Sequence, residues 1–216
     1  MKLGCAGCLI LSVGLMFLAV VAGGFLFLSG NIFEEPRFDP VEWLRGDASS
    51  ARSKLAEVVQ RDLGHSSRQD PILLNEREVN ALVARHLAET AGLRFDPFAI
   101  KLTRGQFVLQ GRTTIGDLLQ GPPFAQLAPQ LPAAQLSRPI WITARGHISV
   151  EPGEPGGRPG RARVDLTEFT LGKQPVGAWP FSIVMGPAGS RLLKWTVPGA
   201  LRDVEIDDRR LVIRTR

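Results

Sequence analysis

The sequence predicts an α+β fold in which an N-terminal transmembrane helix precedes one main helix packed on a curved, mostly antiparallel β-sheet. Three observations predict it. A long uncharged apolar run opens the chain, a stretch from residue 75 has apolar residues at helical spacing, and paired runs after residue 98 alternate apolar and polar residues. We therefore expect a transmembrane anchor over 1–33, a helical stalk or linker over 34–71, and an exported α+β domain over 72–216.

The apolar run is long enough to cross a membrane. No charged residue occurs from Leu3 to Phe33, and about 20 apolar residues span the hydrocarbon core. A cleaved secretory signal is the alternative, but its apolar region is usually about 7–15 residues, and its small-residue cleavage site would lie inside this run. Lys2 before the run and acidic residues after it predict a single-pass protein of the cell membrane, with a cytoplasmic N-terminus and the C-terminal domain outside the cytoplasm.

The chain's two cysteines, Cys5 and Cys8, lie within this run. A structural zinc site needs four ligands, and a redox pair needs a thioredoxin-like context, so neither is predicted. A lipidation signal needs an apolar stretch before the cysteine, which is missing. Gly4, Cys8 and Ser12 instead follow at spacings of four, which is typical of close helix packing in membranes. They predict a homodimer through the membrane helix, although small residues are common in such helices anyway.

The charge of the chain is uneven. From Glu34 to Asn80 acidic residues outnumber basic ones by ten to seven, and from Ala81 onward basic residues outnumber acidic ones by 18 to 11. On a tethered domain such a basic surface fits membrane lipid with anionic headgroups better than nucleic acid. A simply solvated basic surface is the alternative.

Helical signals precede the strands. Asp39-Pro40 begins a helical stalk that is expected to break near Gly46 and to end at Leu63. The main helix begins at the cap Asn75, with Glu78 completing a capping box, and ends at Gly92. Its apolar face consists of Val79, Leu82, Val83 and Leu87.

The second half of the chain predicts antiparallel strands. Alternating residues on both sides of Arg104-Gly105 form a first hairpin. A second, longer hairpin is expected over 138–150 and 161–172, and a closing pair flanks Asp207-Asp208. The proline-rich segment 116–138 is expected to be a partly helical loop, and a short helix is expected over 190–195.

The sequence lacks the motifs of an enzyme. The histidines His65, His86 and His147 have no metal-ligand spacing, and there is no nucleophile elbow, phosphate loop or dinucleotide fingerprint. We therefore predict a non-catalytic protein with no cofactor, no metal site and no nucleic-acid partner.

The stretch "ILLNEREVNALVARHL" resembles the start of the exported domain in bacterial single-pass envelope proteins of the YpmS type. The places of that family's pattern are occupied by Leu74, Glu76, Glu78, Val79, Asn80 and Leu82, with Val79 in place of the usual leucine. "FTLGKQPV" and "VEIDDRRLVI" are similar to its later strand and its closing hairpin. The family's domain is similar to tubular lipid-binding (TULIP-like) modules, which implies an apolar groove between helix and sheet.

Two hypotheses follow. The domain binds lipid or another hydrophobic ligand, or it is a structural or interaction protein of the cell envelope with a filled core and no ligand. The first hypothesis predicts a hydrophobic groove, and its lining would be Leu82, Leu87, Val176, Trp179, Phe181 and Met185.

Overall fold

The fold is built mainly of antiparallel β-sheet. A computed structural model describes residues 32–119, 129, 131–154, 157–175 and 194–216. Of these residues 41% are in strands and 28% in helices. The strands form two separate sheets, and two of the helices pack into the core. The predicted fold class, one main helix on a single sheet after a transmembrane helix, is therefore wrong.

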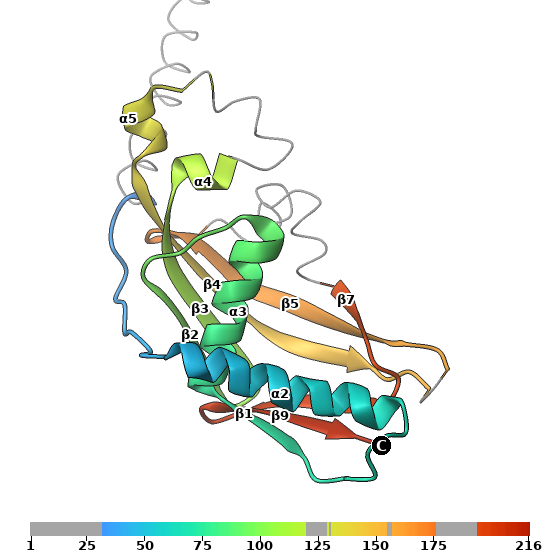
Figure 1. The fold of residues 1–216 in the computed structure, drawn as a ribbon. Coiled ribbons are helices and arrows are strands. Elements are labelled where there is room, and N and C mark those ends of the chain that lie inside the picture. Colours follow the sequence, from blue (N-terminus) through green and yellow to red (C-terminus); the bar gives the residue numbers. More distant parts are fainter. Residues whose placement is uncertain (1–31, 120–128, 130, 155–156, 176–193) are drawn as a thin grey trace, which may run out of the picture.

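The larger sheet has six strands and is curved (Figure 1). Its order is β2-β3-β4-β5-β6, with β7 paired to another part of β5. The strands are β2 (Phe98–Thr103), β3 (Gln106–Thr114), β4 (Pro139–Glu151), β5 (Gly160–Leu171), β6 (Gln174–Pro175) and β7 (Lys194–Val197). All neighbouring strands are antiparallel.

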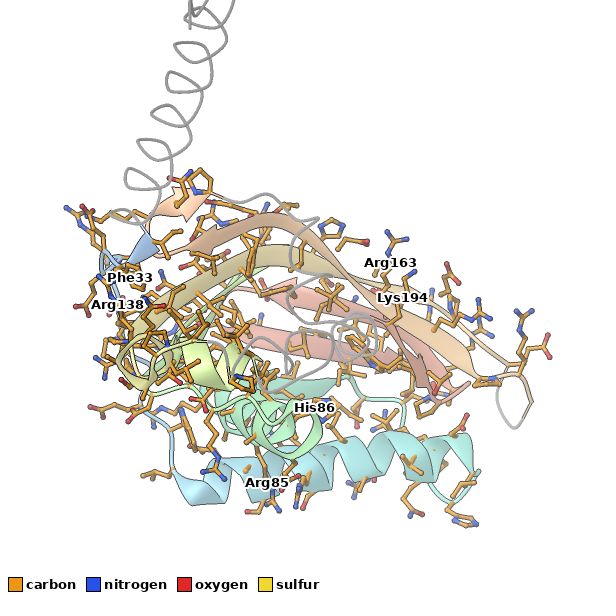
Figure 2. All side chains as sticks on the ribbon, turned by 90° about the horizontal axis from the view of Figure 1, so that it is seen from above. Phe33, Arg85, His86, Arg138, Arg163 and Lys194 are labelled. Atoms are coloured by element: carbon orange, nitrogen blue, oxygen red, sulfur yellow. The ribbon has the colours of Figure 1, made fainter. Side chains whose placement is uncertain are left out.

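The smaller sheet has three strands in the order β1-β9-β8. These are β1 (Ile72–Asn75), β8 (Leu201–Asp207) and β9 (Arg210–Thr215). Figure 2 shows β8 and β9 between the larger sheet and the long helix α2 (Arg45–Asp62). This sheet joins segments far apart in the sequence, because β1 pairs with the last strand, β9.

Two long helices cover the inner side of the sheets (Figure 1). Helix α3 (Glu76–Ala91) packs against the curved sheet, and α2 runs crosswise to α3. The helix expected in the 34–71 segment is thus present as α2, and it belongs to the domain core. The short helices α4 (Ile115–Leu119) and α5 (Ala133–Leu136) follow in the proline-rich segment.

One hydrophobic core joins these layers. It receives side chains from α2, from α3 and from both sheets. Its buried members include Ala51, Val58, Leu74, Val79, Leu87, Ile100, Leu102, Leu201, Ile206 and Ile213. Burial of this kind of side chain is the main favourable contribution to folding.

Several local predictions are confirmed. Asn75 caps α3 in a full capping box with Glu78, and Gly92 ends the helix in the left-handed conformation with φ of 67°. The hairpins β2–β3, β4–β5 and β8–β9 have the expected partners. The short helix expected over 190–195 is not confirmed at its C-terminal end, because Lys194 and Trp195 begin strand β7.

The structure does not uphold the predicted membrane anchor. Within the described ranges, which start at residue 32, no helix is both long enough and apolar enough to cross a membrane. The uncharged run on which the anchor depended falls almost wholly outside them. The predicted transmembrane helix, single-pass topology and cell-membrane location are corrected accordingly. Gly4, Cys8 and Ser12, the predicted helix-packing residues, also lie outside the described residues.

Helix α3 is attached to strand β2 through a buried asparagine. Asn80 is 0% exposed, and its side-chain amide meets the backbone of Ile100 on the free edge of β2. The Ile100 N–H donates to Asn80 Oδ1 at 2.6 Å, and Asn80 Nδ2 donates to the Ile100 carbonyl at 2.7 Å. The amide thus replaces a neighbouring strand, which the edge of a sheet would otherwise lack.

The same edge of β2 also forms hydrogen bonds with the Glu76 carboxylate and with the turn between β8 and β9. The Leu102 N–H donates to Glu76 Oε1 at 2.8 Å, and the Leu102 carbonyl accepts from the Arg209 N–H at 3.0 Å. The Gly105 N–H donates to the Ile206 carbonyl at 2.7 Å. These bonds join the two sheets where the β2–β3 and β8–β9 turns meet.

Glu78 ties α3 to α2. Its carboxylate accepts from Ser50 Oγ at 2.5 Å, from Lys54 Nζ at 2.8 Å and from the Asn75 N–H at 2.9 Å. Burial opposes ionisation of this carboxyl group, but the hydrogen bonds from Lys54, Ser50 and Asn75 outweigh it and hold the Glu78 pKa below its usual value. The charged form is therefore the one that the fold requires.

Replacement of Asn80 is expected to be strongly destabilising. In Asn80→Ala, the Ile100 N–H and carbonyl lose their partners in a buried site, and each such loss costs about 1–3 kcal/mol. We expect the free energy of unfolding to fall by about 2–5 kcal/mol in chemical denaturation. Arg77→Ala, an exposed change on the same helix, is the control and should alter it by less than about 0.5 kcal/mol. Equal effects of the two changes would contradict the role of Asn80.

The pH dependence of stability should report on Glu78. Because its pKa is lowered in the folded state, its contribution is present above about pH 4.3 and disappears as the pH falls through the lowered pKa. Glu78→Gln should therefore lower the melting temperature at pH 7, with a difference from the wild type that shrinks toward pH 3. The exposed Glu42→Gln should show no such difference. A Glu78→Gln difference that stays constant with pH would contradict the assignment.

Candidate functional site

The residues predicted to line a groove divide into two groups. Val176, Trp179, Phe181 and Met185 lie outside the described residues. Leu87 is buried in the core, and Leu82 packs against the same core from α3. A role for any of the six in ligand contact stays a prediction.

A different hollow lies beside α3. It is an open pocket of about 600 Å³ between α3, the N-terminal part of α2 and the loop that leads into β2. Apolar side chains dominate its walls, and charged side chains lie among them. The lining residues are Trp43, Ala48, Ala81, Ala84, Arg85, Ala88, Arg94, Phe95, Asp96 and Phe98.

Alanines keep this pocket open on the helix side. Ala81, Ala84 and Ala88 follow at spacings of three and four, so they lie on one face of α3. Ala48 of α2 lies opposite them in the pocket lining. Short side chains at these four positions leave room that larger apolar residues would fill.

Aromatic side chains form the other walls. The rings of Phe95 and Phe98 are 5.8 Å apart between centroids and are tilted by 38°. Phe95 lies directly on Gly111 of β3, since a Cβ atom there would come within 2.7 Å of the ring. Trp43 is 38% exposed and so presents much of its ring to the solvent-accessible space.

Trp43 is brought to the pocket by an extended arm, residues 35–44, which runs along the sheet before α2 (Figure 1). Phe38 of the arm packs on Trp141 with centroids 5.0 Å apart. The Arg37 carbonyl accepts from Gln110 Nε2 at 3.3 Å, and Asp39 pairs with Lys101. The arm is therefore attached to β2, β3 and β4 upstream of Trp43.

The loop that bears Phe95 is also held in place. The Asp96 N–H donates to the Arg112 carbonyl at 2.8 Å, and the Arg112 N–H donates to the Pro97 carbonyl at 3.0 Å. Arg112 Nε adds a bond of 2.9 Å to the Asp96 carbonyl. This wall of the pocket is thus formed before any ligand arrives, which reduces the entropy lost on binding.

The charged side chains at the pocket differ in whether they form ion pairs. Arg85, on the side of α3 that faces α2 (Figure 2), contacts Glu89 at 2.5 Å, and Arg52 lies 3.8 Å from Glu89. The hydrogen bond from Arg85 holds the Glu89 pKa below its usual value. Arg94 is exposed and, within the described part of the chain, has neither a hydrogen bond nor an ion pair.

Other clusters do not assemble a reactive centre. Ser149 Oγ donates to Asp165 at 3.1 Å, and His147 Nε2 is 3.6 Å from the same carboxylate. Ser149 thus pairs with the acid rather than with the histidine, so this surface cluster is not a nucleophile with its base. Among the residues that the structure describes, no group of three or more metal-ligating side chains is found.

A second, polar hollow lies at the tip of the β4–β5 hairpin. It has about 380 Å³ and mixes acids with arginines, in part from the C-terminal residue Arg216. Arg216 already donates to the Gly153 carbonyl at 3.1 Å. Because its lining is mainly polar, this hollow fits an ordinary solvated hairpin tip.

Comparison of the chain with protein-family models, with curated proteins and with solved structures gives no match. The resemblance to YpmS-type proteins and to TULIP-like modules therefore stays a prediction. The motif that carries it has a structural role here, because Glu76, Glu78 and Asn80 hold α3 in place.

The pocket residues themselves were missed in the sequence. The alanine spacing on α3 is a readable signal, since it places a second, small-residue stripe beside the leucine face. No sequence pattern near Trp43 or Ala48 indicates a pocket, because their position beside α3 depends on how α2 packs against it.

Gly111→Ala tests the close packing behind Phe95. The new methyl group would meet the Phe95 ring, so the ring must move toward the pocket, at a cost of about 1–3 kcal/mol in the free energy of unfolding. Gly46→Ala is the matched control, because a Cβ there meets nothing within 4 Å. We expect chemical denaturation to show a loss for Gly111→Ala and none for Gly46→Ala. An unchanged stability of Gly111→Ala would contradict the packing described.

Proposed function

We propose that this protein is a non-catalytic binder of a small hydrophobic ligand, which it holds in the pocket beside α3. The observation that carries the proposal is the combination of a widely open apolar space with walls that are fixed by the fold. Alanines supply the room, and Trp43, Phe95 and Phe98 supply the apolar contact surface.

The size and chemistry of the pocket support this proposal. Small-molecule sites usually measure about 300–1,000 Å³ and are lined mainly by apolar and aromatic side chains with a few polar groups. The pocket of about 600 Å³ falls within this range and has this lining. Each square ångström of apolar surface that a ligand buries there contributes about 25 cal/mol.

The arrangement of charges supports binding rather than catalysis. Among the described residues that line the pocket are Arg85, Arg94 and Asp96, but no histidine, serine, cysteine or lysine. Proton transfer and nucleophilic attack near neutral pH usually need one of those groups, or a carboxyl group with a raised pKa. Asp96 is exposed, and the described lining places none of those groups beside it.

A pocket-filling variant gives the test. The purified full-length chain is titrated with N-phenyl-1-naphthylamine, a neutral apolar fluorophore whose emission rises in an apolar site. We expect saturable binding to the wild type and binding at least about tenfold weaker to Ala88→Phe, because the new ring occupies the pocket. Ala88 is exposed, so the change should leave the fold intact.

Ala56→Phe is the matched control, an exposed alanine on α2 outside the pocket lining. Its affinity should equal that of the wild type. Absence of saturable binding to the wild type, or equal weakening by both variants, would refute the proposed function. It would favour a structural or interaction protein without a ligand.

A further inference from the structure

The two arginines of the pocket differ in whether an acidic side chain pairs with them, and this difference indicates the charge of the ligand. Arg85 is engaged with Glu89 at 2.5 Å, so its charge is largely matched. Arg94 lines the same pocket, and in the described ranges no acidic group pairs with it. One cation at the pocket is therefore available to a ligand.

The position of Arg94 suits the head of an amphiphile. Arg94 immediately precedes Phe95 in the loop between α3 and β2. Its side chain therefore leaves the backbone next to an aromatic wall of the pocket. Its side chain is exposed, whereas Phe98 is buried. A molecule with its apolar part against Phe95 and Phe98 would place its polar end near Arg94 and solvent.

The neighbouring charges match a head with a single negative charge. Asp96 lies two residues from Arg94 in the same lining, and Arg112 donates to the Asp96 carbonyl at 2.9 Å. Arg94 on the loop and Arg112 on β3 against Asp96 leave an excess of one positive charge here. A doubly charged head would meet stronger repulsion from the Asp96 carboxylate than a singly charged one.

Resting on the proposed function, we propose that the ligand is a carboxylate amphiphile, with its hydrocarbon part in the pocket and its carboxylate paired with Arg94. The planar guanidinium can donate two parallel hydrogen bonds to a carboxylate, which makes this pairing stronger and more directional than a contact with an alcohol. The source of the carboxylate, a free fatty acid or another acyl acid, is left to the choice of probes.

The test compares head groups on one chain length. Dodecanoate, dodecanol and dodecyl phosphate each displace N-phenyl-1-naphthylamine from the full-length protein at pH 8. We expect dodecanoate to bind about tenfold or more tightly than dodecanol and more tightly than dodecyl phosphate. Arg94→Gln should bring dodecanoate to the affinity of dodecanol and leave dodecanol unchanged. Arg202→Gln on β8, an exposed arginine outside the pocket lining, should leave all three affinities unchanged.

The outcomes separate the two proposals. If the fluorophore binds but dodecanoate and dodecanol have equal affinity, or if Arg94→Gln keeps the preference for the acid, the carboxylate inference is wrong and the hydrophobic pocket stands. Tighter binding of dodecyl phosphate than of dodecanoate would overturn the single-charge argument. If neither the fluorophore nor any dodecyl compound binds, the proposed function itself fails.

Discussion

The fold depends on the hydrogen bonds that side chains of α3 make to the backbone at the free edge of strand β2. Strand β2 is an edge strand of the larger sheet, and its outer backbone groups need partners because helix α3 covers them from water. Asn80 supplies both a donor and an acceptor to Ile100, and Glu76 accepts from Leu102. The helix is thereby fixed in distance and in rotation relative to the sheet. A purely apolar contact would allow the helix to slide, whereas these hydrogen bonds are directional.

The pocket follows from that attachment. With α3 fixed at Asn80, its alanine face meets the space beside the loop that carries Phe95, and the loop itself is bonded to Arg112 of β3. Helix α2 is set by Glu78 through Ser50 and Lys54, which brings the N-terminal part of α2 to the other side of the same space. The polar bonds thus fix the positions of helix α3, helix α2 and the Phe95 loop around the pocket. This is how a small domain can keep an apolar space open without collapse.

The sequence predicted what is local and missed what is not. The cap at Asn75, the left-handed Gly92 and the three main hairpins could be predicted because their signals lie within a few residues. The place of Asn80 could not, since its partner Ile100 is 20 residues away and the motif was interpreted as a family signature. Two sheets were taken for one because β1 pairs with β9, which lies more than 130 residues later in the sequence. The pocket was missed because Trp43 and Ala48 meet α3 only after α2 has packed, and the predicted anchor has no support in the described residues.

The central claim, that the alanine face of a fixed α3 forms a hydrophobic binding site, can be tested at atomic level. Nuclear Overhauser effects between the methylene protons of bound dodecanoate and the methyl groups of the protein locate the ligand directly. We expect contacts to the methyl groups of Ala84 and Ala88 and to the ring protons of Phe95. Contacts confined to other methyl groups, with Ala84, Ala88 and Phe95 unaffected by the ligand, would contradict it.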